Sequence, residues 1–149
     1  MVSVLLCLSI VLQPLPAGAE PWVLEPEELG VLGRTLERMG EFQYPYAASV
    51  DIADPDAGAF DASVEVAAAQ FADGSPVIVI DDEGIEDVQH FIVLQTPWQG
   101  LPAGTLLHKD GDNAAVVTRD DDDPAGKRAQ VMMAFLDVMM FFAQLEAAE

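Results

Sequence analysis

The apolar and polar positions divide the chain into a run of strands between two helices. The last apolar stretch predicts a helix over 123–148, because Asp123 is a favoured N-cap and Pro124 suits the first helical position. Within 131–143 only Asp137 is polar. The polar positions form one narrow strip, so we expect most of the circumference of this helix to be buried. The strip consists of Lys127, Gln130, Asp137 and Gln144, with Ala134 and Phe141 in its gaps.

A second helix is predicted near the start, over Pro26–Met39. Its apolar positions recur at intervals of three, four and three residues, which is the spacing of one helix face. These positions are Leu29, Leu32, Leu36 and Met39. Gly40 follows directly and predicts the end of the helix, because glycine is favoured just past a helix C-terminus.

Apolar residues in alternation or in short continuous runs predict six strands between these helices. We expect them over 42–53, 60–72, 77–80, 88–96, 105–109 and 113–118. In the second of these strands, side chains alternate between the two faces, so Val64 and Val66 would lie on one face and Phe71 on the other. A β-bulge near 67–69 would bring them to one face.

The Asp110-Gly111 pair predicts a hairpin, in a register that places Lys109 opposite Asp112 and His108 opposite Asn113. Short turns join antiparallel strands, since a parallel crossover needs a dozen or more residues. The predicted fold is therefore α+β: a single domain with a twisted antiparallel sheet of about six strands. An N-terminal and a C-terminal helix pack on one face of this sheet, with the C-terminal helix deepest.

The first residues have the pattern of a cleaved signal peptide. An apolar run over 2–12 precedes two prolines, and Ala17-Gly18-Ala19 supplies small residues before a cleavage point. The run is about half of the ~20 residues that a spanning helix needs. We therefore expect residues 1–19 to be removed, leaving one acidic domain over 20–149 that is exported to the periplasm or the outside. The alternative is a retained N-terminal helix. Cys7, the only cysteine, lies in this segment, so no disulfide is expected in the mature domain.

The net charge of −20 comes from 26 acidic residues against six Lys and Arg. Such a surface repels nucleic acid and anionic membranes, so we expect neither as a partner. The same repulsion destabilises the compact state unless salt screens it. The composition therefore suits a salt-adapted exported protein.

A cluster of carboxylates after the 77–80 strand is the candidate metal site. It consists of Asp81, Asp82, Glu83, Glu86 and Asp87. Oxygen-rich loops bind Ca²⁺ where the chain makes them converge, so a divalent-cation-binding domain is one alternative function; otherwise the loop is simply solvated. The stretch from Asp54 fails as an EF-hand, because Gly58 and Ala59 occupy positions 5 and 6. No other cofactor is expected.

Two histidines, His90 and His108, are the candidate bases of a small hydrolase or isomerase. Each has a structural alternative, as a sheet residue or a cross-strand partner. The chain has no Gly-x-Ser-x-Gly elbow and no phosphate-binding glycine loop. No catalytic residue is therefore assigned.

The leading hypothesis is a non-enzymatic accessory domain that binds a protein or peptide, or a second copy as a homodimer. Four of the six methionines lie in the last helix, and Met adapts to varied partners. Trp98 lies in a Pro- and Gly-rich loop, either as an exposed anchor or folded back as a lid. The predicted contact residues are Trp98, Met133, Met140 and Phe141.

Overall fold

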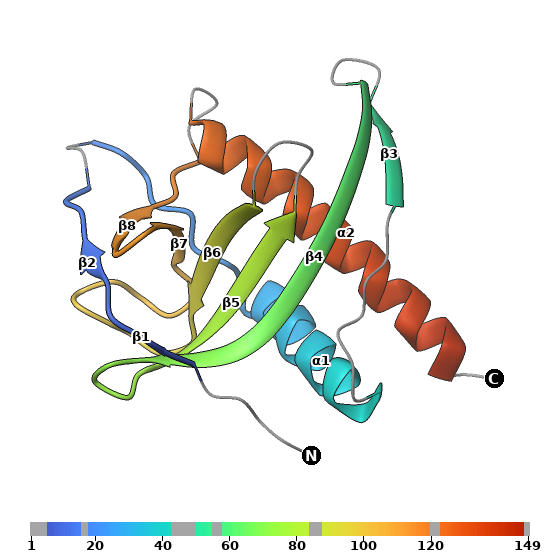
Figure 1. Ribbon diagram of the computed structural model, residues 1–149, viewed down its shortest axis with the longest axis horizontal. Coiled ribbons are helices and arrows are strands. Elements are labelled where there is room, and N and C mark those ends of the chain that lie inside the picture. The colour runs from blue at the N-terminus through green and yellow to red at the C-terminus, as the bar shows by residue number, and fades with distance from the viewer. Residues whose placement is uncertain are drawn as a thin grey trace.

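The protein is described here by a computed structural model, which covers residues 6–15, 18–42, 50–54, 58–83, 88–119 and 123–147 (Figure 1). Eight strands and two helices lie within these ranges. The strands are β1 (Leu6–Leu8), β2 (Val11–Leu12), β3 (Val50–Asp54), β4 (Gly58–Phe71), β5 (Pro76–Glu83), β6 (Val88–Leu94), β7 (Leu106–Asp110) and β8 (Asn113–Val116). The helices are α1 (Pro26–Phe42) and α2 (Pro124–Ala147).

The sheet has the order β1-β4-β5-β6-β7-β8-β2, with β3 paired to β4. Strands β4 to β8 form an antiparallel meander, whereas β1 is parallel to β4 and β2 is parallel to β8. An antiparallel meander with an odd number of strands has outer strands that run in the same direction. One N-terminal segment can therefore lie parallel to both β4 and β8.

This segment brings the two outer strands of the meander close together at one end. From Leu8 to Val11 the chain advances three residues, which span at most about 11 Å. Leu8 is in register with Phe71 of β4, and Val11 is in register with Asn113 of β8. The sheet is therefore curled into a half-barrel, and residues 6–12 bridge its open side (Figure 1).

Two apolar clusters lie on the two faces of the curled sheet. The outer cluster joins the helices to the sheet through residues such as Leu32, Phe91 and Leu136, all of which are fully buried. The inner cluster fills the curl. It comprises Ala69, Phe71, Val77, Val79, Ile92, Leu94, Trp98, Leu107, Ala114 and Val116.

The predicted α+β class is confirmed in its coarse form, a sheet with two helices, but three details differ. The sheet has more than six strands, it is mixed instead of antiparallel, and the helices are placed differently. Helices α1 and α2 pack against each other, and β4 is the strand whose backbone each approaches most. The strand count and the mixed character differ because residues of the expected leader add β1 and β2 to the sheet, parallel to β4 and β8.

Both helices begin where the sequence signals predict, but α1 ends later than predicted. Asp123 caps α2, because its Oδ1 accepts a hydrogen bond from the Ala125 amide at 3.0 Å. On the predicted polar strip, Lys127, Gln130 and Ala134 are exposed. In contrast, α1 does not end before Gly40 but continues to Phe42.

The predicted bulge in β4 is absent, since Ser63 to Gln70 pair continuously with Glu83 to Pro76. Val66 faces the outer cluster and Phe71 faces the inner one. Both parities carry apolar residues because β4 contributes Val66 to one cluster and Ala69 and Phe71 to the other, so the pattern contains no slip. Of the predicted 42–53 strand, Phe42 belongs to α1 instead, 43–49 lie outside the described residues, and β3 covers the rest.

The hairpin after β7 is confirmed, but its register differs from the prediction. Asp110 pairs with Asn113, which leaves Gly111 and Asp112 as the two loop residues. Gly111 has φ of 60°, whereas the predicted loop would require a positive φ at Asp110. A glycine at the first loop position satisfies the turn without that cost.

Candidate functional site

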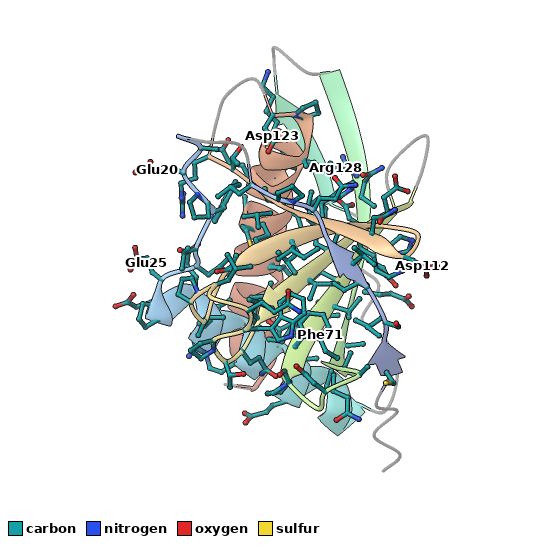
Figure 2. The ribbon with its side chains drawn as sticks, turned by 90° about the vertical axis from the view of Figure 1, so that its left-hand side faces the viewer. Glu20, Glu25, Phe71, Asp112, Asp123 and Arg128 are labelled. Atoms are coloured by element: carbon teal, nitrogen blue, oxygen red, sulfur yellow. The ribbon has the colours of Figure 1, made fainter. Side chains whose placement is uncertain are left out.

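The groove between β4 and β8 is the feature that most resembles a binding site, and residues 6–15 of the chain occupy it. Figure 2 views the molecule from the side on which this N-terminal segment lies. Both edges of the groove bond to the segment through main-chain groups. The Ala72 amide donates to the Leu8 carbonyl at 3.0 Å, and the Val11 amide donates to the Asp112 carbonyl at 2.7 Å. The Gln13 amide donates to the Ala114 carbonyl at 2.8 Å.

The side chains of this segment alternate between the groove and solvent. Leu8, Ile10 and Leu12 are half-buried and pack against the inner cluster, as does Leu15. Cys7, Ser9 and Gln13 are exposed, and Val11 retains 64% of its surface. This period of two is that of a strand with one face on a core. Packing of the segment in the groove does not require an apolar residue at Val11, which faces solvent. An apolar residue at this position is expected if the segment is the core of a signal peptide.

Trp98 closes one end of the groove. Its ring stacks on Phe71 with centroids 4.2 Å apart, and its Nε1 donates to Asp73 Oδ2 at 3.2 Å. The turn that holds it has Gln99 and Gly100 at positive φ, with Trp98 and Leu101 exchanging both main-chain hydrogen bonds. This is the pattern of a tight type I′ turn. Trp98 is 7% exposed, so of the two predicted alternatives it adopts the folded-back one.

A cavity of about 170 Å³ lies beside this aromatic pair. The N-terminal segment contributes Leu8, Ser9 and Ile10 to its wall. The rest of the wall is formed by Phe71, Ala72, Asp73, Trp98 and Gln99. The cavity therefore lies where the segment, the β4–β5 turn and the Trp98 turn meet.

The five predicted metal ligands are not brought together among the described residues. β5 extends to Glu83, so Asp81 and Asp82 are consecutive strand residues and point to opposite faces of the sheet. The side chain of Glu83 and all of Glu86 and Asp87 lie outside the described part. Among the side chains that are described, no group of three or more His, Cys, Asp or Glu could hold a metal ion.

Each of the first two carboxylates instead has a basic partner. Asp81 Oδ1 lies 2.7 Å from Nδ1 of His90, its cross-strand neighbour on the inner face. On the outer face, Asp82 forms an ion pair with Arg128 from α2, with Nε–Oδ2 at 2.7 Å and Nη2–Oδ1 at 2.9 Å. Sequence spacing could not reveal either pair, because both depend on strand and helix placement.

His108, the other candidate base, faces the outer cluster. Its Nε2 lies 2.8 Å from Gln89 Oε1, and its ring is tilted against Phe91 with centroids 5.3 Å apart. Burial lowers the pKa of His108 below its usual 6.5, although Asp110 and Asp123 oppose that shift. The imidazole is therefore neutral at pH 7, and its contacts are those of a cross-strand partner.

The predicted contact residues of α2 are only partly described. Met133 is 6% exposed and belongs to the outer cluster, so a partner does not reach it in this conformation. Packing of α1 alongside α2 widens the buried side of the helix beyond the stripe that faces the sheet. The side chains of Met140 and Phe141 lie outside the described part, and their role in contact stays a prediction.

Comparison of the chain with protein-family models, with curated proteins and with solved structures gives no match. The described helices include none that is long and apolar enough to cross a membrane.

Proposed function

We propose that this chain is an exported, non-enzymatic binding domain that accepts an extended apolar peptide segment of a protein partner in the groove between β4 and β8. One observation carries the proposal. Residues 6–13 occupy that groove as a strand, hydrogen-bonded to both edges and packed on the inner cluster. This is the geometry of recognition by strand addition, in which main-chain bonds give affinity and alternate side chains give specificity.

The occupying segment is also the segment predicted to be removed. Cleavage after Ala19 would leave β4 and β8 with unpaired main-chain groups and would uncover the inner cluster. Unpaired sheet edges readily pair with another chain. The exported form would therefore present an empty acceptor site, and the leader would be its stand-in before cleavage.

The chain from Glu20 onward makes contacts that do not involve the leader. The Trp22 amide donates to the Val117 carbonyl at 2.7 Å, and the Leu24 amide donates to the Gly104 carbonyl at 2.8 Å. All members of the outer cluster also lie beyond residue 19. These contacts support folding of the cleaved form.

The test is binding of a synthetic peptide with the sequence of residues 5–15, with Cys7→Ser, to protein that begins at Glu20. A change in tryptophan fluorescence reports occupancy, because the Trp98 indole lines the site whereas Trp22, the other tryptophan, lies in the outer cluster. We expect saturable binding, and a peptide with Ile10→Asp should bind at least tenfold more weakly, since it would bury a charge. A scrambled peptide of equal composition is the control. Equal binding of the scrambled peptide, or no binding at all, contradicts the proposal.

The Asp81–His90 pair favours a second candidate function, proton transfer by His90. A carboxylate that bonds one ring nitrogen fixes the tautomer, so the other nitrogen can act as a base. Both side chains are partly exposed on the inner face of the sheet. A hydrolase or isomerase screen tests this candidate: His90→Gln should abolish any activity found, whereas activity retained in that variant contradicts it.

A further inference from the structure

The cavity beside Trp98 combines three features that suit a positively charged side chain. Two aromatic rings form part of its wall, and such rings attract cations at their faces. The Asp73 carboxylate also lines it. Finally, the chain carries a net charge of −20, so a basic partner is attracted over longer distances as well.

Asp73 remains ionised in this setting. Its Oδ1 accepts a hydrogen bond from the Ser75 amide at 2.8 Å, and its Oδ2 accepts one from the Trp98 indole at 3.2 Å. The Ser75 hydrogen bonds are the main cause that lowers the pKa of Asp73 below 3.8, with a smaller contribution from Trp98. The carboxylate is therefore held by two hydrogen bonds and is negative at neutral pH.

Three residues of the bound segment line the cavity: Leu8, Ser9 and Ile10. Leu8 and Ile10 are half-buried and pack against the inner cluster, whereas Ser9 is exposed, so Ser9 is the lining position at which a longer side chain would not displace that packing. A volume of about 170 Å³ holds at least five water molecules, at roughly 30 Å³ each. A lysine side chain has about as many heavy atoms as the cavity has room for water molecules, so it fits this volume.

We propose that this cavity is a cation subsite of the acceptor groove, so that the preferred peptide carries a basic residue at the position of Ser9, between the two apolar residues that enter the groove. The inference rests on the proposed function, because it specifies which segment the groove takes. Aromatic contact and the Asp73 carboxylate would act on the same ammonium group. The leader itself lacks this residue and is therefore a weak occupant.

The test uses the uncut chain, in which the segment is already docked and no second molecule is needed. We expect Ser9→Lys to raise the melting temperature by about 2–4 °C relative to Ser9→Met, a neutral side chain of similar length. The same comparison is made in an Asp73→Asn background, where the difference should vanish. A double-mutant cycle is needed because Asp73→Asn also alters the Trp98 hydrogen bond.

Gln13→Lys is the matched control, because Gln13 is exposed on the same segment but does not line the cavity. It reports the general benefit of adding a positive charge to an acidic protein. Equal gains from Ser9→Lys and Gln13→Lys, or a Ser9→Lys advantage that persists in the Asp73→Asn background, overturn the subsite. Because peptide binding is not involved, this failure is distinct from failure of the proposed function, which the peptide titration reports.

Discussion

Replacement of Arg128 in α2 should lower the stability of the fold, because it leaves the buried carboxylate of Asp82 without its ion-pair partner. Asp82 is 1% exposed and its carboxylate is held at two points by the Arg128 guanidinium. Replacing Arg128 with Met keeps much of the apolar stem but leaves the Asp82 charge buried. Breaking a buried ion pair on one side costs about 3–5 kcal/mol. Because Arg128 retains 18% exposure and water can partly replace it, we expect about 3 kcal/mol at pH 7.

The pH dependence of this loss identifies its cause. Burial is the largest influence on Asp82 and raises the pKa of its carboxyl above 3.8, while the charge and hydrogen bonds of Arg128 lower it. Without Arg128 the folded-state pKa should rise further. An acid with a raised folded-state pKa favours folding when protonated, and this contribution is lost as the pH rises through that pKa. The loss should therefore be largest at pH 7 and shrink as the pH falls towards 3.8.

Urea denaturation of the wild type and the variant between about pH 4 and 7 measures this difference. Lys127→Met is the matched control, because it removes the same charge from an exposed neighbour and should cost less than about 0.5 kcal/mol. Adding Asp82→Asn to Arg128→Met should recover part of the loss at pH 7. The reasoning is refuted if Arg128→Met costs no more than Lys127→Met, or if its cost is unchanged at the lower pH.

Three further predictions follow from the packing and the charge. Leu136→Ala should lower the free energy of unfolding by about 2–5 kcal/mol, measured by chemical denaturation, because the side chain is fully buried. Gln130 is exposed on the same helix, so Gln130→Ala should change stability little. Equal losses in the two variants would contradict the orientation of α2 described above. Gly104→Ala should lower the melting temperature, because Gly104 has φ of 92° and a Cβ would lie 2.6 Å from the Leu24 carbonyl oxygen; an unchanged melting temperature would contradict that approach. Near-molar NaCl should raise the melting temperature by screening the acidic surface, and an equal gain from millimolar Ca²⁺ at constant ionic strength would instead indicate specific sites.

The sequence predicted those features that depend on local signals. Asp123 and Pro124 define the start of α2, and alternation located β4 to β8 because each strand carries its own apolar pattern. The curl of the sheet was not predictable in this way. β4 has apolar residues at both odd and even positions. From the sequence alone, this pattern fits a bulge that brings them to one face equally well as a strand with an apolar cluster on each face.

The candidate site was missed for a related reason. Residues 2–12 are apolar except for Ser3 and Ser9, and periodicity alone does not show whether such a run is a signal peptide or a buried strand. Its parallel pairing with β4 and β8 depends on the curl, a property of the whole sheet. The ion pair of Asp82 with Arg128 likewise joins residues far apart in the sequence, and neither residue type signals the other.

Hydrogen exchange at the Ala72 amide tests the strand-accepting groove most directly, because this amide donates to the Leu8 carbonyl of the docked segment. The account predicts that it is protected in the uncut chain, exchanges rapidly in protein that begins at Glu20, and is protected again when the peptide of residues 5–15 is added. The Val79 amide, in the central strand β5, is the internal control and should stay protected throughout. An Ala72 amide that exchanges rapidly in the uncut chain, or that the peptide fails to protect, would contradict the account.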